Sequence, residues 1–200
     1  MKNTSIMKTK TANIRKMTVT AVLGAVASAL MFLEISVPVV PSFLKLDFSE
    51  LPALIAAFLF GPLSGAAVCL IKNLVHLFFT TTFGVGELAN FILGAVFVIP
   101  AGALYKRGSS RKSAILGALA GTALMGIASL FTNYYITYPI YAQFMPMESI
   151  LQAYRLIVPG IKTLWQALLV FNLPFTLIKG LLNALITFLV YKKLSPILKR

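Results

Sequence analysis

The chain has 200 residues, of which 58% are hydrophobic and only 12% are charged. A soluble domain carries about 25% charged residues to cover its surface, so this composition excludes an ordinary soluble protein and indicates that lipid surrounds much of the exterior. The net charge of +13 does not indicate a nucleic-acid-binding protein, because most Lys and Arg residues lie in short clusters at the ends of apolar runs, which is the pattern of membrane topology signals.

The first predicted element is a membrane-spanning helix over residues 17–33, preceded by a basic tail, residues 1–16. No convincing small-residue cleavage site follows the apolar run, so we expect a retained helix and not a secretion signal. Within it, Ala21, Ala25 and Ala29 recur at every fourth position. Such a stripe lets another helix approach closely; the residues alone leave open whether that helix belongs to this chain or to a partner.

The next apolar stretch, residues 51–79, is divided by the dipeptide Gly61-Pro62. Proline removes a backbone donor and glycine loosens a helix, so we predict a short span over residues 51–60 and another over residues 63–79. Polar Lys72, Asn73 and His76 and the single Cys69 lie in the second. We interpret the cysteine as a packed small hydrophobe. For the polar residues, a structural contact between helices is at least as good an interpretation as a functional site. No second His or Cys stands at metal-ligand spacing from His76.

Three further apolar runs follow, over residues 88–105, 113–147 and 164–191. The long connections, residues 36–50 and 139–162, contain prolines, and the second also contains an amphipathic stretch near residues 150–157. Long loops that share one face of a rigid bundle usually carry the function. We therefore expect the functional face at these loops.

Charge placement predicts the orientation. Basic clusters lie at residues 2–16, 106–112 and 192–200, and the positive-inside rule assigns all of them to the cytoplasm. This requires an even number of crossings, so we predict an all-α polytopic membrane protein, one domain over residues 1–200, with six transmembrane helices and both termini cytoplasmic. The five acidic residues then fall on or near the outer side: Glu34, Asp47, Glu50, Glu87 and Glu148.

Polar residues inside spans are costly and mark functional candidates. Lys179 lies in the last apolar run, five residues after Pro174. If that proline opens the final helix, the lysine lies about 8 Å below the helix start, a depth that suits a cavity open to the outside; a lysine that snorkels to the interface is the alternative. Asn133 lies near the outer end of the preceding span and can offer a donor and an acceptor to a ligand.

The sequence contains no G-x-x-x-x-G-K-[ST] phosphate loop, nucleophile elbow or zincin motif, and we expect no pair of carboxylates inside the membrane. A membrane enzyme usually shows a cluster of ionisable residues. We therefore expect a binding protein without a cofactor of its own, which takes energy from a partner. A small membrane enzyme or assembly factor acting on lipids is the alternative of another class.

Several motifs together resemble one family, the riboflavin-specific S components of energy-coupling factor (ECF) transporters, the RibU type. The motifs occur in the family's order along nearly the whole chain: F-L-K-L-D-F-S-E-L-P at residues 43–52, F-G-P at 60–62, K-N-L at 72–74, A-N-F at 89–91, N-Y at 133–134 and P-F-x-x-x-K-G at 174–180. The resemblance implies six helices in the bacterial plasma membrane. It also implies a partner module of one transmembrane coupling protein and two ATPases, which drives inward release of riboflavin captured outside.

The resemblance further implies roles for particular residues. In the family the first loop caps the flavin, which assigns Leu46, Asp47 and Phe48 to the cap. Polar groups of the last two helices bind the ligand's polar edge and ribityl chain, which assigns Asn133 and Lys179 to it. It also favours the coupling protein as the partner of the first-helix alanine stripe.

One position departs from the family pattern. Thr176 stands where the family commonly has asparagine, and a threonine keeps a hydroxyl but lacks the paired donor and acceptor of an amide. We therefore expect Thr176 at the site with altered ligand geometry, and a phosphorylated flavin (FMN) or another vitamin on the same fold is an alternative ligand.

Overall fold

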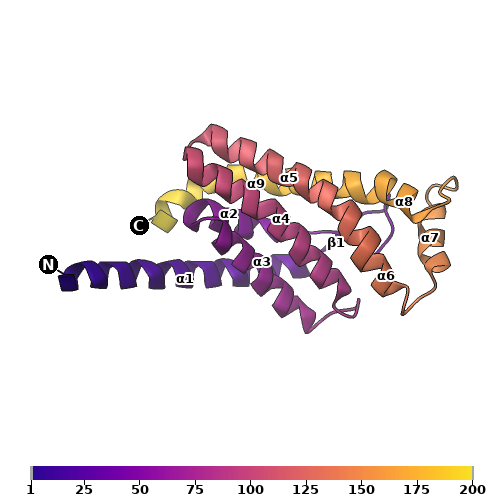
Figure 1. Cartoon of the computed structure of the whole chain (residues 1–200), viewed down its shortest axis with the longest axis horizontal. Coiled ribbons are helices and arrows are strands. Elements are labelled where there is room, and N and C mark those ends of the chain that lie inside the picture. Colours follow the sequence, from indigo (N-terminus) through magenta and orange to yellow (C-terminus); the bar gives the residue numbers. More distant parts are fainter. Residues whose placement is uncertain (1, 200) are drawn as a thin grey trace.

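Apolar runs separated by short polar connections fold into a bundle of helices, which a computed structural model describes for the backbone of residues 2–199 and the side chains of residues 13–190. The helices of the bundle run roughly along one axis (Figure 1). They are α1 (Lys2–Phe32), α2 (Glu50–Phe60), α3 (Pro62–Leu77), α4 (Val85–Gly108), α5 (Arg111–Thr132) and α9 (Leu173–Lys199). The shorter elements are β1 (Ile35–Ser36), β2 (Lys45–Leu46), α6 (Tyr138–Tyr141), α7 (Met147–Arg155), α8 (Leu164–Ala167) and two π-helical turns, η1 (Asn133–Thr137) and η2 (Leu168–Asn172).

Among the described residues, four helical stretches are long and apolar enough to cross a membrane: Asn13–Phe32, Val85–Gly108, Arg111–Tyr141 and Leu164–Val190. This confirms a predominantly helical membrane protein. The other two bundle helices are shorter, because α2 has 11 residues and α3 has 16. At 1.5 Å per residue α2 spans about 16 Å, roughly half of a hydrocarbon core. Helix lengths alone therefore leave the predicted number of six crossings untested.

The predicted break between α2 and α3 is confirmed. Gly61 adopts a φ of 95°, a conformation that L side chains rarely adopt, and its N–H donates to the Ala57 carbonyl, 3.0 Å away. Pro62 then occupies the first position of α3, where its missing N–H costs no helical hydrogen bond.

Helix α2 is the centre of the bundle. It packs against α1, α3, α4 and α9, and every residue from Pro52 to Phe58 is buried. The small Ala53, Ala56 and Ala57 side chains let the surrounding helices approach it. An apolar helix that is buried all round needs no lipid-facing side, so its short length is compatible with a position inside the bundle.

The start of the last helix differs from the one assumed for the depth of Lys179. Helical backbone starts at Leu164 and continues through α8, η2 and α9, so Pro174 does not open this helix. The N–H of Leu173 bonds to the Leu168 carbonyl, five residues back. This π turn shifts the hydrogen-bond pattern immediately before the proline, which lacks a donor, and the helix accommodates Pro174 without ending there.

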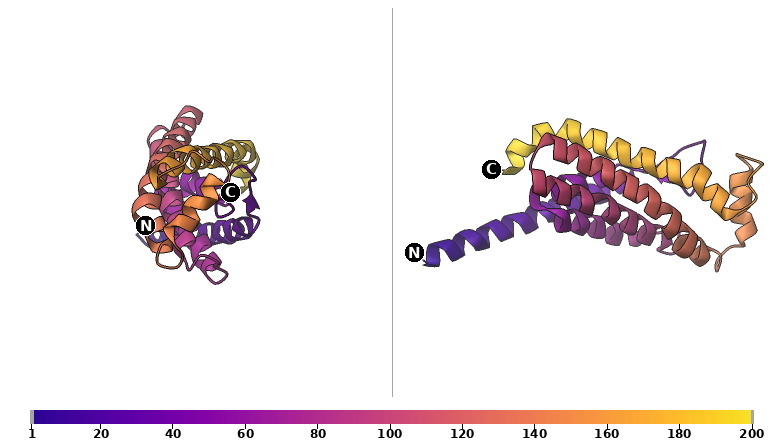
Figure 2. Two further views of the ribbon diagram at one scale, coloured as in Figure 1. Left: turned by 90° about the vertical axis from the view of Figure 1, so that its right-hand side faces the viewer. Right: turned by 45° about the horizontal axis from the view of Figure 1, so that its top comes forward.

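The segment between α1 and α2, residues 33–49, is mostly not helical. It contains an antiparallel β1–β2 pair, in which Ile35 lies opposite Leu46, and it enters the bundle to begin α2. The loops that join α3 to α4 and α6 to α8 lie at the same end of the molecule, whereas α1 begins and α9 ends at the opposite end (Figures 1 and 2). The long loops, where we expect the functional face, therefore lie opposite the termini.

Two apolar clusters stabilise the two ends of the bundle. One surrounds α2 and extends to Met125, and the other gathers Tyr138, Ile150 and Tyr154 from the loop end. The amphipathic stretch predicted near residues 150–157 is α7, whose buried residues are Ile150 and Tyr154.

Helices α4 and α5 meet so closely that a side chain at Gly121 has no room. A Cβ there would lie 2.3 Å from the Phe97 carbonyl oxygen. Gly121→Ala should therefore lower the stability of the bundle by about 1–3 kcal/mol, measured as a lower thermal unfolding midpoint in detergent. Gly160→Ala is the control, because nothing lies within 4 Å of its Cβ position; equal midpoints for the two variants would contradict the close packing.

Candidate functional site

Two adjoining cavities lie at the loop end of the bundle, with volumes of about 450 Å³ and about 130 Å³. They share Phe43, Lys45, Asn90, Tyr138 and Tyr141 in their walls, so they are compartments of one hollow. Ligand pockets in proteins have volumes of about 300–1,000 Å³. The hollow is large enough for one drug-sized molecule.

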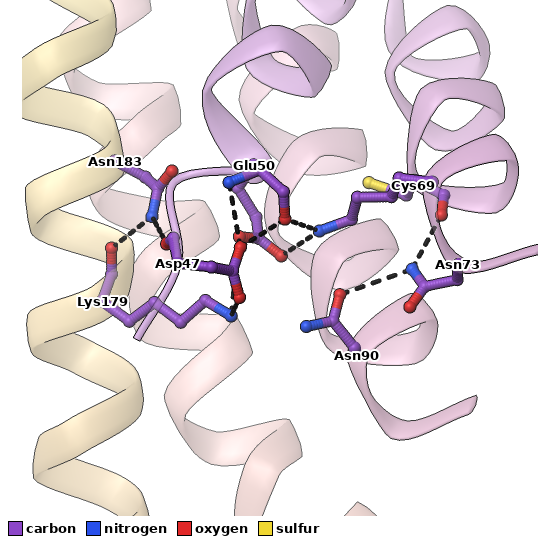
Figure 3. A network of polar contacts seen from close by, with 9 residues as sticks. Asp47, Glu50, Cys69, Asn73, Asn90, Lys179 and Asn183 are labelled. Atoms are coloured by element: carbon purple, nitrogen blue, oxygen red, sulfur yellow. Dashed lines mark hydrogen bonds and ion pairs between the residues drawn. The ribbon is translucent and has the colours of Figure 1, made fainter. Parts of the chain in front are cut away.

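A buried ion pair forms one wall of this hollow. The Lys179 Nζ of α9 donates to Asp47 Oδ2 over 2.7 Å, and both side chains are almost completely buried. Asn183, one turn further along α9, donates to the Asp47 carbonyl oxygen over 3.2 Å. Figure 3 shows how these contacts attach the loop segment around Asp47 to α9.

The charge of Asp47 is maintained by its neighbours. The Lys179 ammonium lies 2.7 Å from its carboxylate, and the Ser49 hydroxyl also donates to it. A cation at this distance favours the charged form of a carboxyl, so Asp47 and Lys179 stabilise each other as an ion pair.

A second buried ion pair lies next to the first. Lys72 Nζ donates to Glu50 Oε1 over 2.7 Å and also to the Ser49 hydroxyl, which in turn donates to Asp47. Lys72 is thus a contact between helices, as interpreted from the sequence. The expectation that no pair of carboxylates lies inside the bundle is wrong, because Asp47 and Glu50 are both buried there. The loop returns into the bundle before α2 begins and carries these acids inward.

A third polar cluster lies at the loop between α3 and α4. Glu87 Oε1 lies 2.8 Å from His76 Nδ1, and its Oε2 accepts hydrogen bonds from the hydroxyls of Thr80 and Thr82 over 2.9 and 3.1 Å. His76 and Glu87 also line the larger cavity. The glutamate therefore fixes the shape of this loop at the cavity wall.

Both π turns contribute to the smaller cavity. η1 contributes Asn133 and Thr137, and η2 contributes Asn172. A π turn inserts one residue into a helix and is frequent at functional sites. No sequence pattern in these apolar helices distinguishes a π turn from an α turn, so Thr137 and Asn172 were not predicted.

Aromatic rings line the hollow on the loop side. The Phe43 ring meets Tyr138 edge to face at a centroid distance of 6.2 Å, and Tyr138 meets Tyr141 at 6.1 Å. At the edge of the larger cavity, exposed Phe83 and Phe144 from two different loops stack at 4.3 Å. An aromatic wall opposite a buried polar wall suits a flat ligand with one polar edge.

The structure brings most of the predicted ligand-binding residues to this hollow. Asp47 lines the larger cavity, and Asn133, Thr176 and Lys179 line the smaller one. The other two predicted cap residues line neither cavity: Leu46 belongs to β2, and Phe48 precedes α2. Sequence reasoning missed Glu50, which lines the smaller cavity; its only signal was a charge beside an apolar run.

The alanine stripe of α1 faces away from the bundle. Ala21, Ala25 and Ala29 are exposed. Gly24 lies on the other side of α1, where the Ile71 side chain of α3 occupies the space that a Cβ at Gly24 would need. The stripe is therefore not used for packing within this chain.

Comparisons with known proteins agree with the resemblance in the motifs. Residues 15–191 match the family model described as "ECF transporter, substrate-specific component". The chain is 35% identical to the riboflavin transporter RibU of Staphylococcus aureus (strain TCH60), over 90% of each chain. It is 34% identical to the riboflavin transporter FmnP of Bacillus subtilis (strain 168), covering 92% of this chain and 93% of that one.

A solved structure is also similar. It is described as "Structure and mechanism of the S component of a bacterial ECF transporter", and it matches with a TM-score of 0.74 at 34% identity, over 94% of this chain and 99% of that chain. The similarity therefore covers the whole bundle, including the segments around both cavities.

The aromatic side of the hollow depends on a hydrogen-bonded trio. The Tyr154 hydroxyl donates to Asn172 Oδ1 over 2.7 Å and also contacts the Tyr138 hydroxyl. Tyr154→Phe should leave the buried Asn172 oxygen without its donor and lower the stability by about 1–3 kcal/mol, measured by thermal unfolding in detergent. The exposed Tyr135 provides the control; a loss of stability in Tyr135→Phe as large as in Tyr154→Phe would contradict this role.

Proposed function

The chain belongs to the substrate-specific components of ECF transporters, and we propose that its hollow captures riboflavin and that a partner module drives the vitamin inward. The observation that carries this proposal is the hollow itself, with buried polar groups on one wall and aromatic rings on another. Two named relatives, from Staphylococcus aureus and Bacillus subtilis, are riboflavin transporters.

Riboflavin matches this arrangement chemically. Its isoalloxazine is a flat ring system with a donor and carbonyl acceptors on one edge, and its ribityl chain carries hydroxyls. In the proposal, Phe43, Tyr138 and Tyr141 contact the ring system, while Asn133 and Thr176 bond to polar atoms of the ligand.

Charge in the larger cavity supports riboflavin over FMN as the ligand. Glu34, Asp47 and Glu87 line this cavity, and the two basic groups beside them are already paired: Lys45 with Glu34, and His76 with Glu87. A phosphate would meet carboxylates without a free cation to neutralise it. The neutral ribityl chain avoids this repulsion.

The proposed orientation places the hollow outside the cell. The basic connection between α4 and α5 lies at the same end as the start of α1 and the end of α9, opposite the hollow (Figure 1). The positive-inside rule then assigns that end to the cytoplasm. In this proposal α2 and the segment of residues 33–49 together complete a crossing, which gives six crossings.

Direct binding tests the proposal. The purified protein should quench the fluorescence of added riboflavin at a 1:1 ratio, should bind FMN more weakly, and should not bind thiamine or biotin. The physical reason for the order is that the ring system is common to both flavins and only FMN carries a charged phosphate. Saturable binding of thiamine or biotin without binding of riboflavin would overturn the assignment.

Lys179→Met should weaken riboflavin binding by about ten-fold or more and also lower stability, because it leaves the Asp47 carboxylate buried and unpaired. In the double variant Asp47→Asn/Lys179→Met, stability should recover while affinity stays low, since the ammonium remains absent from the cavity wall. Fluorescence titration and thermal unfolding measure the two effects. The exposed Lys112→Met is the control, and wild-type affinity in Lys179→Met would exclude Lys179 from the site.

The proposed partner surface is the exposed stripe of α1 at Ala21, Ala25 and Ala29. Ala25→Leu should reduce co-purification with the transmembrane coupling protein and its two ATPases, and should reduce riboflavin uptake, because a larger side chain prevents close approach of helices. Riboflavin binding by the isolated subunit should be unchanged. Ala123→Leu, at an exposed alanine of α5, is the matched control; an equal loss in both variants would contradict a specific surface.

A further inference from the structure

Lys72 is a completely buried lysine that lies outside both cavities. Its relative exposure is 0%, and it lines neither compartment of the hollow. Its ammonium lies beside the start of α2, within 2.7 Å of Glu50 Oε1. A buried ammonium is expensive to maintain, and helix packing alone would favour an apolar side chain at this position.

Two routes connect Lys72 to Lys179. One passes through the Ser49 hydroxyl, which accepts from Lys72 and donates to Asp47, the partner of Lys179. The other passes through Glu50, whose Oε1 bonds to Lys72 and whose Oε2 lies 3.6 Å from Lys179 Nζ. Residues 47–50 thus join α3 to α9 (Figure 3).

The position of Lys179 between two carboxylates is asymmetric. It makes a hydrogen bond of 2.7 Å to Asp47 but none to Glu50, whose buried Oε2 has no hydrogen-bond partner among the described side chains. Within this group Lys72 neutralises Glu50, which leaves Lys179 to neutralise Asp47. Without Lys72, the ionised Glu50 would have Lys179 as its nearest cation.

We propose that Lys72 is a positioning residue for ligand binding, which holds Glu50 and Ser49 so that Lys179 stays on Asp47 at the cavity wall. Removal of Lys72 alone draws the Lys179 ammonium towards Glu50 and releases Asp47. Removal of the Lys72 and Glu50 charges together leaves the Asp47–Lys179 pair intact. The charge balance, and not the lysine itself, is then what the site requires. The ligand-binding part of this inference rests on the proposed riboflavin function.

Four proteins test the proposal: wild type, Lys72→Met, Glu50→Gln and the double variant Lys72→Met/Glu50→Gln. Riboflavin affinity is measured by fluorescence quenching. In parallel, mass spectrometry follows acylation of the Lys179 amine by a small acylating reagent, which needs no ligand. Lys72→Met should bind riboflavin about ten-fold more weakly, and its Lys179 should be acylated more slowly, because two carboxylates that face one ammonium favour its charged, unreactive form. The double variant should return both quantities to within about three-fold of wild type.

A purely structural lysine gives a different result, because restored charge balance would not restore affinity. Wild-type affinity in Lys72→Met, or a folded double variant that binds as weakly as Lys72→Met, would overturn the proposal. If Lys72→Met does not fold, the riboflavin affinity of the folded double variant is compared directly with that of wild type. An affinity within about three-fold of wild type supports the proposal, and a loss of about ten-fold contradicts it. If the wild type binds no riboflavin, the proposed function fails, and the acylation rates alone decide whether Lys72 positions Lys179. Exposed Lys106→Met is the matched control for loss of a lysine.

Discussion

Charge balance inside a lipid-surrounded bundle is the constraint on which the rest of this structure depends. Asp47, Glu50, Lys72 and Lys179 are all buried, and an isolated charge at such depth would cost several kcal/mol or more. The two ammonium groups lie opposite two carboxylates, so the net charge of the four side chains is zero. These pairs also fix geometry, because they attach the segment that begins α2 to both α3 and α9.

The same contacts would allow a non-helical segment to lie at the depth of the membrane, as the proposed six crossings require. Backbone without helical hydrogen bonds is tolerated there only where protein surrounds it or where it lines a cavity. Residues 33–49 meet this condition through the β1–β2 pair and through the hydrogen bond from Asn183 to the Asp47 carbonyl. Because α2 therefore starts within the bundle, space remains on its loop side, and the aromatic residues of the loop end enclose that space as the hollow.

Much of the fold and part of the candidate site could be predicted from local sequence. Gly61-Pro62 specified the end of one helix and the start of another, because both residues act through their own backbone. Lys179 was identified because a charge in an apolar run is conspicuous. The carboxylate partners were harder to identify, since Asp47 and Glu50 lie in a polar stretch that looks like an exposed loop. Only the path of that loop brings Asp47 next to a lysine that is 132 residues away in the chain.

By itself, the sequence determined that this is a helical membrane protein, that one helix ends at Gly61-Pro62, which end its charges favour for the cytoplasm, and which family it resembles. These properties follow from composition, periodicity and motifs, and none requires knowledge of which residues meet. The tertiary structure decided that Lys179 pairs with Asp47, that Pro174 lies within a continuous helix, and that the alanine stripe of α1 is exposed. Each of these depends on contacts or hydrogen bonds that form only when distant segments pack together, because burial and pairing are properties of the folded chain.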